Sequence, residues 1–213
     1  MNINTGHSPI LVLAPHTDDG EIGCGGTIAA AIEAGLEIYY VAFSSAQISL
    51  PSGAPKDTLV KEVKAATLTL GIKPENLILY EFATRSFPQY RQEILDRMIE
   101  LRARVRPKLI FAPSLNDVHQ DHATVAHEAL RCFKKQSILC YEEPWNNITF
   151  STHCFVQLEE AHLVKKIDAL RCYVSQYHRT YLTEEAVRAL AATRGTQLEG
   201  GYAEAFEVVR WML

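Results

Sequence analysis

The sequence predicts an α/β fold: a Rossmann-like, mostly parallel, doubly wound sheet with helices on both faces. The first observation is a set of short apolar segments without polar–apolar alternation, which is typical of strands buried on both faces. The second is that helical patterns lie between these segments as far as about residue 142. Repeated strand–helix–strand units form parallel sheets with right-handed crossovers.

Five segments are expected to form the parallel strands. They are residues 10–14, 37–43, 77–80, 109–112 and 138–141. All are far shorter than the roughly 20 apolar residues that a membrane-spanning helix needs. The sequence therefore predicts no transmembrane segment.

Four helices are expected between these strands. The first, residues 24–34, is rich in small residues that suit close packing on a sheet. The second lies between a capping Asp57 and Gly71, and the third ends before Pro107. Their apolar positions follow the helical spacing: Leu59, Val63, Ala66 and Leu70, then Ile94, Met98, Leu101 and Val105. The fourth helix is expected over residues 125–133.

The last third of the chain is expected to extend the same domain. It carries a strand over residues 153–157, helices over 160–172 and 183–194, and a last strand over 205–211. No Gly/Ser-rich or Pro-rich linker interrupts the sequence, so residues 1–213 are predicted to form one domain.

Composition and charge narrow the class of protein. The chain has 213 residues, of which 47% are hydrophobic and 22% charged, enough for a substantial core. A net charge of −4 offers no general attraction for nucleic acid, so no such partner is expected. Five cysteines without a C-x-x-C pair, and no charged-then-apolar leader before Ile10, favour a cytoplasmic location.

Two segments carry residues that bind metals, and each directly follows a predicted strand. Pro15-His16-Thr17-Asp18-Asp19 follows the first strand, and Asp117-Val118-His119-Gln120-Asp121-His122 follows the fourth. Singly, these residues also suit ordinary loops, turns or helix caps. Together they lie at the edge of the sheet where such folds bind ligands. We therefore expect the active site there.

These residues can supply a catalytic metal site. Such a site needs three protein ligands, an open position and a nearby base that is not a ligand. His16, Asp19 and His122 could bind one ion, which leaves Asp18 free to accept a proton.

Two further residues of the second segment have expected roles. His119 could donate a hydrogen bond to a developing oxyanion, and Asp121 could orient a neighbouring imidazole.

The two segments resemble the signatures of the PIG-L/LmbE-type zinc-dependent N-deacetylases. Residues 15–19 with Gly23-Cys24-Gly25-Gly26-Thr27 are similar to P-H-P-D-D-E-x-x-G-x-G-G-T, and residues 119–122 are similar to H-x-D-H. Residues 194–195 and 202–206 also resemble that family's C-terminal stretch. The resemblance implies an enzyme that removes the N-acetyl group from an amino sugar of the N-acetylglucosamine type, or from its conjugate. It also implies a possible homo-oligomer.

The resemblance assigns roles to individual residues. It implies Zn²⁺, or another divalent ion such as Fe²⁺, on His16, Asp19 and His122. It makes Asp18 the general base, and His119 the group that assists the oxyanion or the leaving amine. It further implies that Asp121 tunes His119.

The chain departs from the family signature at two positions. Thr17 replaces a proline, and Gly20 stands where the family commonly has glutamate. If that glutamate only braces the loop, its loss is tolerable. If it orders a ligand, the affinity for the metal or the choice of metal differs.

Three other functions are alternatives. A dinucleotide-binding Rossmann module is disfavoured because residues 23–26 do not fit G-x-G-x-x-G and because Asp18 and Asp19 would repel a pyrophosphate. A metal-dependent phosphoesterase would use similar ligands, and a sugar-binding relative would lack zinc. Beyond the two segments, Arg85, Tyr90 and Arg91 follow the third strand and could contact a sugar or a phosphate.

Overall fold

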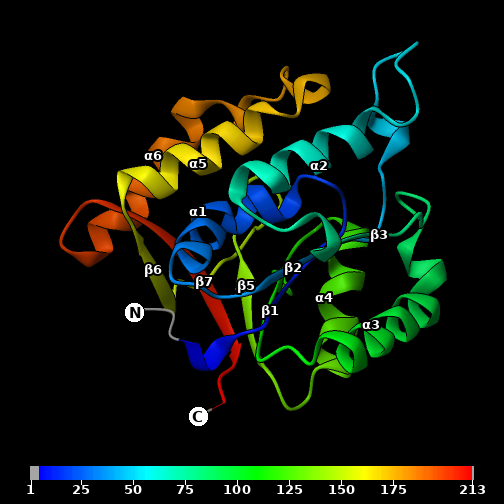
Figure 1. Ribbon diagram of the computed structural model, residues 1–213, viewed down its shortest axis with the longest axis horizontal. Coiled ribbons are helices and arrows are strands. Elements are labelled where there is room, and N and C mark those ends of the chain that lie inside the picture. The colour runs from blue at the N-terminus through cyan, green and yellow to red at the C-terminus, as the bar shows by residue number, and fades with distance from the viewer. Residues whose placement is uncertain (1–4, 213) are drawn as a thin grey trace.

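Seven strands form one sheet in the computed structural model, which describes residues 5–212 (Figure 1). Their order is β3-β2-β1-β4-β5-β7-β6. The strands are β1 (Ile10–Ala14), β2 (Ile38–Ala42), β3 (Leu77–Leu79), β4 (Leu109–Pro113), β5 (Ser137–Tyr141), β6 (Cys154–Leu158) and β7 (Tyr202–Arg210). β1 to β5 are parallel, whereas β7 runs antiparallel to its neighbours β5 and β6. The predicted mostly parallel sheet is confirmed.

Helices cover both faces of the sheet, as predicted. Residues 5–212 contain the α-helices α1 (Asp19–Glu33), α2 (Thr58–Leu70), α3 (Arg91–Val105), α4 (Gln120–Cys132), α5 (Glu160–Arg171) and α6 (Glu184–Gly195). Figure 1 shows α1, α2 and α5 over one face, and α3 and α4 over the other. α6 packs on α5 through a separate small apolar cluster.

Both faces of the central strands are buried. In β1, Ile10 and Val12 belong to the apolar layer beneath α1 and α2, whereas Leu11 and Leu13 belong to the layer beneath α3 and α4. All four side chains are 0% exposed. This explains why the strand segments show no polar–apolar alternation in the sequence.

The chain reverses its direction of travel across the sheet between β1 and β4. It builds β1, β2 and β3 toward one edge, then returns past β1 to build β4 and β5 toward the other. β1 and β4 pair in parallel, with Val12 opposite Phe111. The loops that follow these two strands therefore leave the sheet side by side, at the point where folds of this class bind ligands.

The first helix begins at Asp19, whereas the sequence predicts its start at residue 24. Cys24 has non-helical dihedrals (φ −146°, ψ 23°), which places a kink inside α1. Each glycine lowers helix propensity by about 1 kcal/mol relative to alanine, so residues 19–26 lack a helical pattern. Tertiary packing compensates: a Cβ on Gly23 would lie 2.2 Å from the Tyr141 ring, and one on Gly26 would lie 2.5 Å from Leu158.

No helix among residues 5–212 is long and apolar enough to cross a membrane. The five cysteines are unpaired. The cytoplasmic location and the possible homo-oligomer stay predictions.

A buried polar cluster holds the loop between β1 and α1. The Tyr40 hydroxyl lies 3.0 Å from the Thr17 carbonyl oxygen, and the Tyr173 hydroxyl lies 2.7 Å from it. Both hydroxyls also contact the Glu21 carboxyl, which is 0% exposed. Burial raises the pKa of Glu21 to about 8, so this carboxyl is mostly protonated at neutral pH. The cluster fixes the backbone directly before Asp18.

Gly20 is required by the same cluster. Its N–H donates to the Tyr40 hydroxyl over 3.0 Å. A Cβ at this position would lie 2.5 Å from Tyr40 Cε2, so the tyrosine ring occupies the space that a side chain at residue 20 would need. Gly20, which replaces the glutamate of the family signature, therefore leaves the space that the Tyr40 ring of β2 fills.

Gly20→Ala is expected to lower the free energy of unfolding by roughly 1–3 kcal/mol, the usual cost of overpacking a core. The loss should occur despite the higher helix propensity of alanine. Urea unfolding measures it. Gly25→Ala, on the same helix, is the control. Its added Cβ would lie 3.0 Å from Lys166 Cγ, a milder overlap than the 2.5 Å to Tyr40 at Gly20, so it is expected to lose less stability. Equal losses in the two variants would contradict the specific fit between Gly20 and Tyr40.

Candidate active site

A cavity of about 290 Å³ opens at the edge of the sheet where β1 and β4 end. Several stretches that are far apart in the sequence contribute to its wall. Among the lining residues are His16, Thr17, Asp18, Asp19, Thr84, Arg85, His119, His122, Glu143, Trp145, Asn146, Gln176, Arg179 and Tyr181. Both segments that the sequence singled out therefore meet in one cavity.

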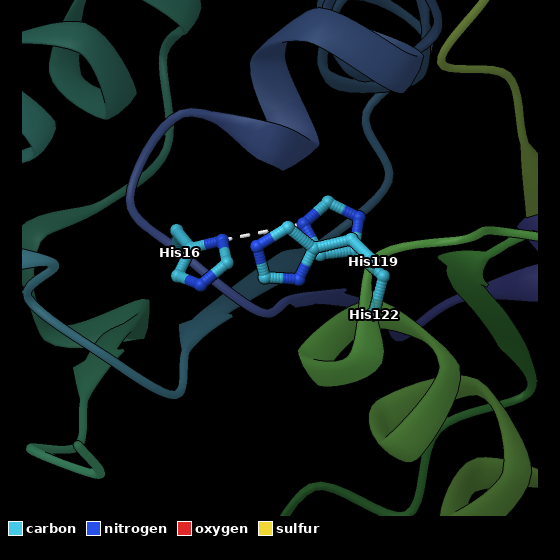
Figure 2. A group of neighbouring side chains, drawn as sticks. All are labelled: His16, His119 and His122. Atoms are coloured by element: carbon cyan, nitrogen blue, oxygen red, sulfur yellow. Dashed lines mark hydrogen bonds between the residues drawn. The ribbon is translucent and has the colours of Figure 1, made fainter. Parts of the chain in front are cut away.

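Three of the predicted residues converge on one point. His16 Nδ1 lies 3.2 Å from His122 Nε2 and 3.2 Å from Asp19 Oδ2. His122 Nε2 lies 3.4 Å from Asp19 Oδ2. Figure 2 shows the imidazoles gathered together, with His16 before α1 and His122 at the start of α4. The three facing atoms form a nearly equilateral triangle.

The triangle fits one divalent ion. Ligands about 2.0–2.1 Å from a tetrahedral zinc lie about 3.3–3.4 Å from one another, close to the separations of these atoms. Two imidazole nitrogens and one carboxylate oxygen are also the donor types that such sites use. His16, Asp19 and His122 could therefore hold a metal with little rearrangement.

Negative charge around the imidazoles favours a cation at this point. Burial lowers the pKa of His16, but the carboxylates of Asp19 and Asp121 outweigh it and raise the pKa to about 10. Burial opposes ionisation of Asp19, but the imidazoles of His122 and His16 bring its pKa below the usual range. A metal ion bound here would replace the proton of the His16 imidazole.

The outward nitrogen of each imidazole contacts a carboxylate. His16 Nε2 lies 3.1 Å from Asp121 Oδ2, and His122 Nδ1 lies 2.9 Å from Asp117 Oδ2. Asp121 is itself held by the backbone N–H groups of Arg85 (2.5 Å) and Phe87 (3.1 Å). Carboxylates in this position fix the orientation of metal-binding imidazoles.

Asp121 contacts both imidazoles, His16 through its carboxylate and His119 through its backbone N–H. The sequence left open which imidazole it would orient, and the resemblance implied His119. In the structure the His119 ring accepts at Nδ1 from the Asp121 backbone N–H over 3.2 Å, so His119 caps α4. The carboxylate of Asp121 is turned to His16, because the Arg85 and Phe87 N–H groups hold it there.

His119 lies beside the triangle as a hydrogen-bond donor. Its ring centroid is 4.7 Å from that of His122 and 5.1 Å from that of His16. Burial and the neighbouring imidazoles lower its pKa, so the ring is neutral at pH 7. Because Nδ1 accepts a hydrogen bond, the proton of the neutral ring is on Nε2. That N–H suits an oxygen that gains negative charge.

Asp18 lies in the cavity wall, outside the triangle. It precedes α1, is half-buried, and makes no side-chain hydrogen bond to cap the helix. Burial and the charge of Asp19 raise its pKa to about 6. A carboxyl with a pKa near neutrality suits proton transfer.

Sequence reasoning assigned no role to two acidic residues of the site. Asp117 lay within the second segment but was given none, and Glu143 lay outside both segments. Glu143 is 1% exposed, and its Oε2 lies 3.5 Å from His122 Nδ1. Its Oε1 has no hydrogen-bond partner among residues 5–212. Because Glu143 follows β5 at the same edge of the sheet, the rule that located the two segments could have found it.

The glycine-rich start of α1 does not form a phosphate-binding turn. Residues 23–26 are buried, and Gly23 and Gly26 allow contact with Tyr141 and Leu158. Asp18 and Asp19 line the cavity at the start of this helix. The glycines serve helix packing, which disfavours the dinucleotide-binding alternative.

The chain is similar in sequence to a known family and to named deacetylases. The family model PIG-L, GlcNAc-PI de-N-acetylase, matches residues 11–133. Diacetylchitobiose deacetylase of Thermococcus kodakarensis is 23% identical over 94% of this chain and 82% of the relative. The probable N-acetyl-α-D-glucosaminyl L-malate deacetylase 2 of Bacillus anthracis is 24% identical over 95% and 91%.

A solved structure supports the fold. The conserved protein TT1542 from Thermus thermophilus superposes with a TM-score of 0.79 at 26% identity, over 96% of each chain. The matched residues 11–133 form more than half of the chain and contain both site segments. The chain therefore belongs to the PIG-L family.

Proposed function

We propose that this chain is a metal-dependent hydrolase that removes the N-acetyl group from an amino sugar, or from a conjugate of that sugar, and releases acetate. The observation that carries the proposal is the convergence of His16 Nδ1, Asp19 Oδ2 and His122 Nε2 in the cavity that Asp18 also lines. Relatives of similar length are named as deacetylases of diacetylchitobiose and of N-acetylglucosaminyl malate.

His16, Asp19 and His122 would hold the ion. Zn²⁺ is the first choice because two imidazoles and one carboxylate are a known catalytic zinc set, and Fe²⁺ suits the same donors. When bound, such an ion polarises the acetamide carbonyl and lowers the pKa of water. Asp121 and Asp117 are positioning residues, since they hold the outward nitrogens of the two imidazoles.

Two residues of the cavity would move protons and stabilise charge. Asp18 takes a proton from the attacking water, which its pKa near neutrality allows. His119 donates its Nε2 hydrogen to the oxygen that becomes negative as the amide carbon turns tetrahedral, or to the departing amine.

An amine-release screen on the metal-loaded protein tests the reaction. Suitable substrates are N-acetylglucosamine, its malate and inositol conjugates, diacetylchitobiose and nucleotide-linked sugars. The expected products are acetate and free amine in equal amounts. Release of phosphate from phosphate esters, without release of amine, would instead establish the metal-dependent phosphoesterase.

Chelation is expected to abolish activity, and Zn²⁺ or Fe²⁺ should restore it at about one ion per chain. Elemental analysis measures the ion. The thermal midpoint should also fall on chelation, since an ion that binds only the folded state stabilises that state. A fully chelated protein that kept its rate would exclude the proposed mechanism.

The two adjacent aspartates should respond differently to substitution. Asp19→Ala is expected to lose metal and activity together. Asp18→Asn should keep the metal and lose on the order of 10²–10⁴ in kcat and in kcat/KM, because an amide cannot accept the proton. If Asp18→Asn were metal-free while Asp19→Ala kept the ion, the two roles would be reversed.

Asp117→Asn is expected to weaken metal affinity about 10–100-fold, because His122 would lose its carboxylate partner. A competition titration with a chelating dye measures the affinity. At saturating metal most of the rate should return, as expected for a positioning residue. Asp168→Asn, at an exposed ion pair with Arg171, is the control and should leave the affinity unchanged.

A further inference from the structure

Two arginines line the cavity without an ion-pair partner. Neither Arg85 nor Arg179 pairs with a carboxylate among residues 5–212. Arg194, by contrast, pairs with Glu142 through two nitrogens, its Nε lying 2.9 Å from Oε2. The cavity wall therefore carries positive charge that no acidic side chain of the described chain neutralises by direct contact.

Neutral groups hold Arg179 in place. Its Nε donates to Gln176 Oε1 over 2.7 Å, and its Nη1 donates to the Tyr181 hydroxyl over 2.6 Å. Gln176 is itself 2% exposed and donates to Ser175 Oγ over 3.0 Å. These contacts use two of the five N–H groups of a guanidinium and leave its charge intact. Arg179 is thus fixed in position with donors to spare, which suits the binding of an anion.

An aromatic surface adjoins this charge. The rings of Trp145 and Tyr181 are stacked, with centroids 3.8 Å apart and an interplanar angle of 14°. Both rings line the cavity, and Trp145 is 40% exposed. The Tyr181 hydroxyl is the acceptor that holds Arg179. Two aromatic residues and a fixed cation therefore stand together in the wall.

We propose that Arg179, with Arg85, binds a carboxylate or phosphate group on the substrate, so that the substrate is an acidic conjugate of the N-acetylated sugar. This inference rests on the proposed function. The cavity of about 290 Å³ lies at the small end of ligand sites, so it suits one sugar with a small acidic substituent.

The positions of the arginines and of the metal-site residues set the orientation of such a substrate. Arg85 and Arg179 line the same cavity as His16 and His122, and the acetamide must reach the ion that His16, Asp19 and His122 would hold. The acidic group therefore binds at the arginines, and the neutral acetamide lies toward His16 and His122. If Arg179 only balanced the charge of Asp18, its removal would change the rates on acidic and neutral substrates equally. If Arg179 binds the acidic group, its removal changes the rate on acidic substrates more.

The test compares three substrates on the metal-loaded protein. N-acetylglucosamine 1-phosphate and the N-acetylglucosaminide of glycolic acid carry an anion, and methyl N-acetylglucosaminide is neutral. For at least one of the anionic substrates, kcat/KM for amine release should exceed that of the neutral sugar by about tenfold or more. Comparing the two anionic substrates shows whether the site prefers phosphate or carboxylate. Arg179→Gln should lower the preference for the anionic substrate about tenfold, chiefly through KM. Arg104→Gln, on α3 across the sheet, should leave the preference unchanged.

Binding measured by calorimetry separates the two proposals. Preferential binding of an anionic sugar without amine release would contradict the proposed deacetylation and support the anion site. Amine release without preference for the anionic substrates, or an equal preference in the wild type and Arg179→Gln, would overturn the anion site and leave deacetylation standing. Failure of all three sugars to bind would overturn the anion site as well.

Discussion

The pairing of β1 with β4 is the constraint on which the site depends. The two strands are neighbours because the chain reverses its course across the sheet between them. As a result His16 and His122, which are 106 positions apart in the sequence, bring nitrogens within 3.2 Å. Asp19 joins them because α1 begins directly after the β1 loop. Any other neighbour for β1 on this side would separate the two imidazoles.

The same arrangement concentrates negative charge in a buried place. Asp19, Asp117, Asp121 and Glu143 are each at most 6% exposed, and burying carboxylates costs free energy unless hydrogen bonds or a cation compensate. Backbone N–H groups satisfy Asp121, and the imidazoles satisfy part of the rest. A divalent ion would complete this compensation, so we expect folding and metal binding to be coupled.

The sequence predicted that the two segments would meet because the rule behind that prediction is geometric: polar residues just after parallel strands meet at one edge of the sheet. It could not predict contacts that depend on long-range packing. The Asp121 carboxylate points toward His16 because the backbone N–H groups of residues 85 and 87 hydrogen-bond to it. The fixing of Arg179 depends on Gln176 and Tyr181, which no spacing rule connects with a metal site. The early start of α1 was missed because its glycines are stabilised by neighbours, not by local propensity.

The two departures from the family signature illustrate how a fold can replace a motif residue. What the site requires is a fixed backbone between His16 and Asp19, and in this chain two tyrosine hydroxyls hold the Thr17 carbonyl oxygen. Tyr40 comes from β2 and Tyr173 from the segment after α5, so the support is distant in sequence and close in space. Tyr40 can approach because residue 20 has no side chain. Gly20 thus belongs to the packing that holds the loop between His16 and Asp19.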